Sequence, residues 1–253
     1  MLDSGAGAGA IATTISGAPE GIMIYVRAYA TNSAGTAYSA QTRFKLCAPL
    51  TVTHIAGAGT NKAPVTKTVT YKTVAVNYTG NPMCWMTQNL GADREADSAT
   101  DASEAAAGWY WQFSGTTGYM HDGTSRTPAT GWVTVAGSGT GSYSFDPCGY
   151  MLGSPWLVAS NSEFIAADGP PQNWTTNAEA FASVLKLHNG GILSTATGAL
   201  SQRGASAGAS GNYWVSGINS TTTTASFYYT GSVSSTMGNN ANKNSGLSVR
   251  CVK

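Results

Sequence analysis

The side chains best suited to catalysis in this chain are its three histidines, His54, His121 and His188, which lie in separate segments. His121 is followed by Asp122 and lies close to Tyr119, so a general base and a carboxylate are neighbours there. No Ser or Cys nucleophile motif accompanies this pair. His188 recurs at helical spacing with apolar residues, which predicts a core position for its ring. The sequence therefore predicts a protein that is not an enzyme.

Carboxylates that could bind a metal ion are concentrated in one short segment, which contains Asp93, Glu95, Asp97, Asp101 and Glu104. Ca²⁺ prefers six to eight oxygen ligands, and such a segment supplies several. The spacing and the glycine of an EF-hand are missing, and acidic residues are also common where a helix begins. Two interpretations follow: a solvated acidic helix start, or a structural calcium site at Asp93, Asp97 and Asp101. No other cofactor is expected.

Four widely spaced cysteines, Cys47, Cys84, Cys148 and Cys251, are present, and none forms a Cys-x-x-Cys pair. With only three histidines, this pattern argues against a zinc site. An even number of separated cysteines predicts two disulfides and an oxidising compartment, with free thiols as the alternative. Four cysteines allow three pairings, and their spacing does not choose among them.

The composition limits the class of protein and its partners. Charged residues make up 10% of the 253 residues and the formal net charge is +1, which gives no electrostatic basis for binding nucleic acid or an anionic membrane. A hydrophobic content of 42%, with 7 Trp and 12 Tyr, predicts an aromatic core. No apolar run is long enough to span a membrane, and residues 1–5 lack the features of a signal peptide. We expect an extracellular or cell-surface protein.

Patterns of alternation and turn residues predict a β-rich α+β fold with one or two helices and long loops. A helix is predicted to begin at Ser160, which has Glu163 at the capping-box position. The clearest helix is predicted over 177–188, where apolar residues recur at helical spacing. An N-terminal hairpin is predicted from residues 22–30 and 38–46. Further strands are predicted at 50–55, 67–74, 84–91, 109–113, 211–214 and 246–253, and a strand followed by a turn is predicted over 192–200.

The segment between the last two predicted strands is the candidate ligand-binding surface. It is rich in Ser, Thr, Gly, Asn and Tyr, the residues of adaptable binding loops, and we expect an exposed loop over about residues 219–244. The alternative is that its aromatic residues belong to the core and that the asparagines form a solvated turn. The candidate residues are Asn219, Tyr228, Asn239, Asn240, Asn242 and Asn244.

Three sequence motifs in a fixed order resemble the Fibrobacter succinogenes major paralogous domain over residues 47–253. They are CWMTQNL at 84–90, CGY at 148–150 followed by SEF at 162–164, and NYW at 212–214 followed by GLSVRCV at 246–252. Residues 153–158 depart from the family pattern, because an expected arginine is missing. Residues 1–46 resemble the last hairpin of bacterial fibronectin type III-like repeats, so we expect a partial module there and a lectin-like domain from residue 47.

The resemblance implies a C-type lectin-like fold, similar to that of formylglycine-generating enzymes, in a surface or secreted bacterial protein. Such a fold brings its first and last strands together, which implies a Cys148–Cys251 disulfide and leaves Cys47 to pair with Cys84. The implied function is adhesion or recognition of a glycan or protein ligand, without catalysis. The alternative is a subunit of an extracellular filament, in which copies pair or exchange β-strands because the N-terminal hairpin is an incomplete module.

Overall fold

A computed structural model describes residues 12–57, 62–78, 80–134, 145–216 and 224–253, without the side chains of residues 78 and 239. The fold is β-rich, with 39% strand and 11% helix, which confirms the predicted β-rich α+β class.

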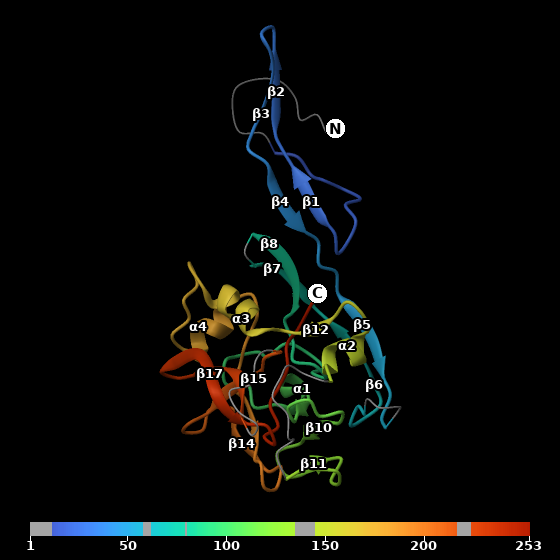
Figure 1. Ribbon diagram of the computed structural model, residues 1–253, viewed down its shortest axis with the longest axis vertical. Coiled ribbons are helices and arrows are strands. Elements are labelled where there is room, and N and C mark those ends of the chain that lie inside the picture. Colours follow the sequence, from blue (N-terminus) through green and yellow to red (C-terminus); the bar gives the residue numbers. More distant parts are fainter. Residues whose placement is uncertain (1–11, 58–61, 79, 135–144, 217–223) are drawn as a thin grey trace.

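The N-terminal hairpin, which we call the ribbon, consists of four short strands in two pairs. Strand β1 pairs with β4, and β2 pairs with β3, so the chain runs out and back once, as predicted. Mutual hydrogen bonds between Ala28 and Ser39 bridge the break between the two pairs. Figure 1 shows the ribbon projecting from the rest of the chain, the body (residues 47–253). The strands are β1 (Met23–Val26), β2 (Tyr29–Asn32), β3 (Gly35–Tyr38) and β4 (Thr42–Lys45).

The first part of the body contains two hairpins. Lys72 interrupts the predicted strand 67–74, because its backbone N–H donates to the side chain of Gln88 and its carbonyl accepts from Thr87. The second hairpin, β7 and β8, forms a four-stranded sheet with two strands from later in the chain, in the order β12-β18-β8-β7. The strands are β5 (Leu50–His54), β6 (Lys67–Tyr71), β7 (Thr73–Tyr78), β8 (Asn81–Met86), β12 (Leu157–Val158) and β18 (Cys251–Val252).

The second part of the body contains the remaining two sheets. A three-stranded sheet of order β11-β10-β9 holds β9 (Tyr110–Trp111), β10 (Gly118–His121) and β11 (Arg126–Thr127). A five-stranded sheet of order β14-β13-β15-β16-β17 is antiparallel except between β13 and β15. Its strands are β13 (Gly190–Leu193), β14 (Leu200–Arg203), β15 (Ser210–Trp214), β16 (Thr224–Gly231) and β17 (Ser234–Asn242).

Four short helices complete the described fold. The capping box predicted at Ser160 and Glu163 is present at the start of α3, and Thr176 and Glu179 form a second one at α4. The predicted helix 177–188 is wrong beyond its first six residues, because Ser183 is extended and its hydroxyl bonds back to the helix end. The helices are α1 (Glu104–Ala107), α2 (Pro147–Leu152), α3 (Asn161–Asp168) and α4 (Asn177–Ala182).

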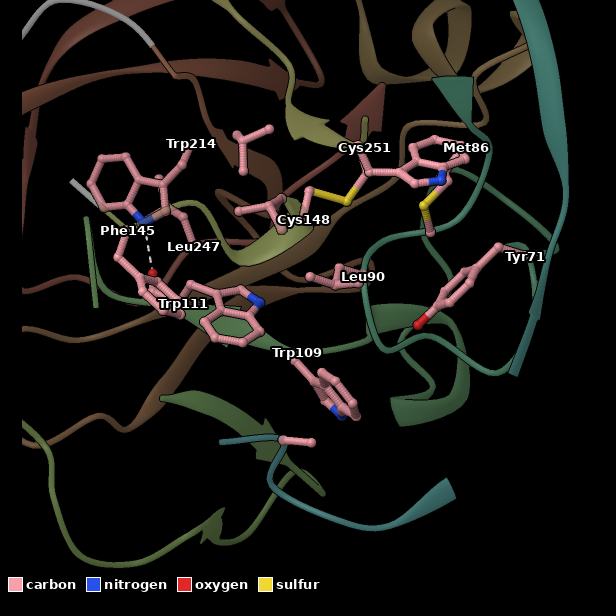
Figure 2. Close-up of a cluster of buried hydrophobic side chains, with 14 of the residues drawn as sticks. Tyr71, Met86, Leu90, Trp109, Trp111, Phe145, Cys148, Trp214, Leu247 and Cys251 are labelled. Carbon is pink, nitrogen blue, oxygen red and sulfur yellow. Dashed lines mark hydrogen bonds between the residues drawn. A yellow bond between two sulfur atoms is a disulfide. The ribbon is translucent and has the colours of Figure 1, made fainter. Parts of the chain in front are cut away.

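The core of the body is aromatic, as predicted. Trp109, Trp111 and Trp214 are each 0% exposed and lie in one cluster with the Cys148–Cys251 disulfide (Figure 2). The indole N–H of Trp214 donates to the carbonyl oxygen of Trp111 at 2.6 Å, so this buried polar group is satisfied. A second cluster packs α3 and α4 against β15 and β16. The two clusters pack the sheets and helices of the body together, and its surface elements are attached to this core.

Candidate functional site

The segment predicted as an exposed loop is instead a β-hairpin. Strands β16 and β17 pair in antiparallel register from Thr224↔Asn242 to Gly231↔Ser234. The sequence analysis did not predict strand β17, because the strand is rich in Ser, Gly and Asn, which are uncommon in strands. The prediction of a loop over 224–242 is therefore wrong. Asn219 lies outside the described residues.

Tyr228 is part of the core and is removed from the candidate site. Its side chain is 1% exposed, and its ring stacks on that of Phe164 at 4.8 Å between centroids. Its hydroxyl donates to Asp168 Oδ2 at 2.7 Å. Burial, together with this bond and the charge of Asp168, raises the pKa of the Tyr228 hydroxyl. The tyrosine therefore ties β16 to the end of α3 and does not face a ligand.

The candidate asparagines separate into buried and exposed positions. Asn244 is 5% exposed, and its backbone oxygen accepts from Gln112 Nε2 at 2.8 Å, so it is structural. Asn242 is exposed, but its side-chain oxygen accepts from the Asn244 N–H at 2.9 Å. Asn240 is exposed on β17, and the side chain of Asn239 is outside the described part. Of the four candidates whose side chains are described, Asn240 and Asn242 are at the surface.

Strand β17 lies at an edge of the five-stranded sheet, as far as the strands are described. Its nine residues, SSTMGNNAN, contain no charged residue and no proline. Edge strands of natural proteins are commonly protected by such residues, and an edge without them can accept a further strand or hydrogen-bonding ligand. Exposed Thr236, Asn240 and Asn242, with Val233 in the adjoining turn, form what we call the β17 edge.

Three aspartates of the acidic segment form ion pairs with Arg94 and Lys67, so they are not free to bind a metal ion. Arg94 forms ion pairs with Asp97 at 2.8 Å and with Asp101 at 2.9 Å, and Lys67 pairs with Asp93 at 2.8 Å. Burial alone would raise the pKa of Asp101, but N–H donors and Arg94 outweigh it and hold that pKa well below its usual range. No group of three or more His, Cys, Asp or Glu in the described part could hold a metal ion. The geometry therefore does not support the calcium hypothesis.

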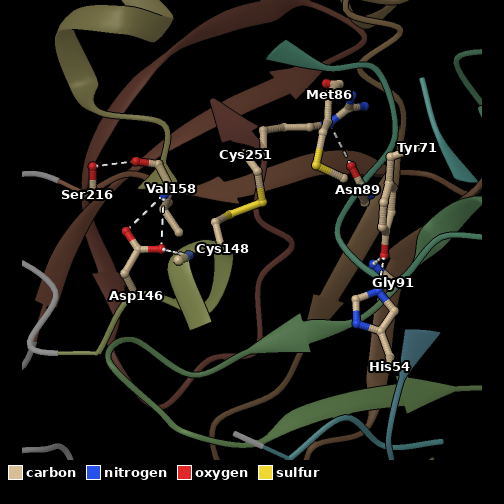
Figure 3. Close-up of a disulfide and its surroundings, with 12 residues drawn as sticks. His54, Tyr71, Met86, Asn89, Gly91, Asp146, Cys148, Val158, Ser216 and Cys251 are labelled. Atoms are coloured by element: carbon tan, nitrogen blue, oxygen red, sulfur yellow. Dashed lines mark hydrogen bonds between the residues drawn. A yellow bond between two sulfur atoms is a disulfide. The ribbon is translucent and has the colours of Figure 1, made fainter. Parts of the chain in front are cut away.

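Two of the three histidines belong to the scaffold. His54 Nε2 lies 2.7 Å from the hydroxyl of Tyr71, which also accepts from the Gly91 N–H (Figure 3). Burial, and then the charge of Lys67, lowers the pKa of His54 to about 4. His188 is 1% exposed, and burial, followed by the charge of Arg250, lowers its pKa to about 3. Both rings are therefore neutral at ordinary pH.

The pair His121 and Asp122 does not form a catalytic arrangement. Both carboxylate oxygens of Asp122 are directed at the following turn, where they accept from Thr124 and Ser125. His121 Nδ1 accepts from the Gly123 N–H at 3.1 Å. Each side chain thus shapes its own turn, and neither activates the other.

Arg250 is a buried hub that sequence reasoning did not single out. It is 0% exposed, and its Nε donates to the side-chain oxygen of Asn89 at 2.9 Å. Its remaining donors reach the carbonyl oxygens of Met86, Leu185 and Lys186. Burying a guanidinium requires such a set of acceptors. The motif at 84–90 and the motif at 246–252 therefore meet at this side chain.

All four cysteines are paired. The disulfides are Cys47–Cys84 and Cys148–Cys251, with Cα–Cα distances of 5.4 and 5.6 Å, the same pairing that the resemblance implies. Asp146 caps α2 and also accepts from the Val158 N–H, which places Cys148 beside β18 (Figure 3).

Comparisons with protein-family models, with curated proteins and with solved structures found no match to this chain. None of the described helices combines the length and the apolar character that crossing a membrane requires.

Proposed function

We propose that this chain is an extracellular, non-catalytic recognition module of the Fibrobacter succinogenes major paralogous domain type, with a C-type lectin-like body. The observation that carries the proposal is that side chains able to do chemistry are buried in the scaffold. His54, His188 and Arg250 are buried and are surrounded by the scaffold. The exposed β17 edge, in contrast, offers neutral hydrogen-bonding groups. This distribution of side chains favours binding over catalysis.

The lectin-like assignment is supported by the way the ends of the body meet. Strand β18 pairs with β8, the second disulfide joins α2 to β18, and Arg250 bonds to Asn89. These contacts unite the motifs that carry the resemblance. Two disulfides also support an oxidising, extracellular location.

The proposed ligand of the β17 edge is a glycan or a protein segment on a surface, so that the module serves adhesion. The side chains of Asn240 and Thr236 supply donors and acceptors that suit sugar hydroxyls, and the strand edge suits an added peptide strand. No charge on β17 opposes either ligand.

Binding to glycan and peptide arrays by the disulfide-intact chain tests this proposal. We expect a bound ligand whose affinity falls by about tenfold or more in the double variant Asn240→Lys and Asn242→Lys. The matched control, Ser206→Lys and Ala207→Lys, adds the same charge on an exposed loop and should change the affinity less than about twofold. A chain that binds nothing on either array, or that consumes the arrayed glycans, would contradict the proposal.

Assembly of copies into a filament is the second candidate function, and the ribbon favours it. Ile22, Tyr25 and Tyr38 are 54%, 57% and 59% exposed, although they lie in or beside paired strands. A two-stranded hairpin is marginal alone, and pairing with another copy would cover this apolar surface. Light scattering and electron microscopy over a concentration series test this candidate. Polymers that grow with concentration support it, and a monomer at every concentration rejects it.

A further inference from the structure

A groove lies where the ribbon meets the body. Its volume is about 470 Å³; one wall is β4, and the other is formed by β7, Gly80 and β8. The lining of the ribbon wall includes Arg43, Phe44 and Lys45, and that of the body wall includes Asn77 and Pro82. The groove is thus bounded by two segments that are distant in sequence and contains both polar and apolar side chains.

Covalent and hydrogen bonds hold the two walls together. The Cys47–Cys84 disulfide joins the chain two residues after β4 to β8. Arg43 Nη1 donates to Asn81 Oδ1 at 3.3 Å, and Lys45 Nζ donates to the main-chain oxygen of Lys253 at 3.1 Å. Both cations are therefore held at the junction of the ribbon and the body, and both line the groove.

The groove concentrates positive charge. Neither Arg43 nor Lys45 forms an ion pair with a described Asp or Glu side chain, and the lining residues include no Asp or Glu. Burial, and then the charge of nearby Lys253, lowers the pKa of Lys45, as expected where cations share a partly desolvated site. The four ion pairs found in the described part of the chain all lie between residues 67 and 101. A mobile anion would relieve this local excess of positive charge.

The chemistry of the walls fits a sugar that carries an acidic group. A guanidinium presents several donors in a plane and matches a carboxylate or a sulfate, while an ammonium adds a compact charge. Tyr25 faces Arg43 across the β1–β4 register, so its ring, 57% exposed, stands on the same face of the ribbon. An exposed aromatic ring can stack on a sugar ring, and the side chain of Asn77 can bond its hydroxyls.

We propose that this groove binds an acidic saccharide, with the carboxylate or sulfate of the sugar held by Arg43 and Lys45. The site is separate from the β17 edge and gives the module a ligand class that the edge does not specify. Occupation of the groove would also clamp the ribbon to the body, because the ligand would contact both walls.

Titration calorimetry with the disulfide-intact chain tests the proposal with three probes: an oligogalacturonate, a sulfated dextran oligomer and neutral maltohexaose. We expect at least one anionic probe to bind, with an affinity that falls as salt is added, and maltohexaose to bind at least about tenfold more weakly. The two anionic probes distinguish a carboxylate ligand from a sulfate ligand.

The double variant Arg43→Gln and Lys45→Gln should weaken anionic binding by at least about tenfold. The matched control, Arg27→Gln and Lys62→Gln, removes the same charge from exposed positions outside the groove and should weaken it less than about twofold. Thermal unfolding of each variant checks that the fold is retained. Arg43→Lys, which keeps the charge without the planar fork, should bind with intermediate affinity.

Three outcomes overturn the proposal: neither anionic probe binds, the control weakens binding as much as the groove variant, or maltohexaose binds as well as the anions. None of them bears on the β17 edge, because the array experiment with Asn240 and Asn242 is read independently. Failure at the groove and failure of the proposed function are therefore distinguishable.

Discussion

The ribbon and the body place similar side chains in opposite environments. In the body, Trp109, Trp111 and Trp214 are 0% exposed, whereas Tyr25 and Tyr38 of the ribbon are more than half exposed. The body stacks sheets and helices around its aromatic rings, while no second layer of described residues covers the ribbon. We therefore expect the body to supply most of the folding free energy, while the ribbon offers uncovered surface.

Replacing a core tryptophan is the strongest way to test this contrast. Trp214→Ala should lower the free energy of unfolding by about 3–5 kcal/mol, because it leaves a cavity and removes the hydrogen bond to Trp111. Urea denaturation, followed by circular dichroism, measures the change. A loss below about 1 kcal/mol would mean that this cluster is not the stabilising core.

Removing each disulfide compares the stability supplied by Cys148–Cys251, inside the body, with that supplied by Cys47–Cys84, next to the ribbon. Cys148 and Cys251 are separated by 103 residues and Cys47 and Cys84 by 37, so loop entropy predicts a loss of about 4–5 kcal/mol for the first pair and about 1 kcal/mol less for the second. Denaturation of the two double Cys→Ala variants tests the order. A larger loss for the Cys47–Cys84 pair would show that the ribbon contributes more stability than its exposure indicates.

Acid should destabilise the body through its buried histidines. The folded chain keeps His54 neutral down to about pH 4 and His188 down to about pH 3, while both protonate near pH 6.5 when unfolded. The unfolded state therefore binds more protons below pH 6.5, and the free energy of unfolding falls as the pH drops toward 4. For His54 the loss is about 3 kcal/mol.

Denaturation curves between pH 7.5 and 4 measure this dependence. The double variant His54→Gln and His188→Gln should flatten the profile, since glutamine does not titrate. The ribbon strands contain no histidine and are not expected to contribute to it. A wild-type profile that is flat across this interval would contradict the neutral, buried state of the two rings.

Substitutions in the ribbon should have the smallest effect on stability. Tyr25→Ser and Tyr38→Ser should change the free energy of unfolding by less than about 0.5 kcal/mol each, because their rings are mostly exposed. The same denaturation assay measures both. A loss of 2 kcal/mol or more, on the order expected of a core residue, would show that the ribbon is packed against a partner.

Local rules predicted those parts of the fold that depend on neighbouring residues. Alternation predicted the ribbon, the capping box predicted the start of α3, and the aromatic content predicted an aromatic core. The helix at 177–188 was overestimated, because the chain leaves the helix after Ala182 and tertiary packing buries Leu185 and His188 in non-helical conformation.

The candidate site was harder to predict, because its outcome depends on distant partners. Tyr228 is buried, and its hydroxyl donates to Asp168, which lies 60 residues earlier in the chain. Asp101 forms an ion pair with Arg94. Strand β17 is composed of residues with weak strand preference and forms because β16 provides a template along its length. The groove at Arg43 depends on residues of β7 and β8 and on Gly80, which no local sequence pattern connects to the ribbon.

Amide hydrogen exchange of the disulfide-intact chain tests the central claim most directly, namely that the body is the stable scaffold and the ribbon an uncovered surface element. The account predicts that amides of β15 and β16 exchange only through global unfolding, while those of β2 and β3 exchange at least about a hundredfold faster. Protection of β2 and β3 equal to that of β15 would contradict it.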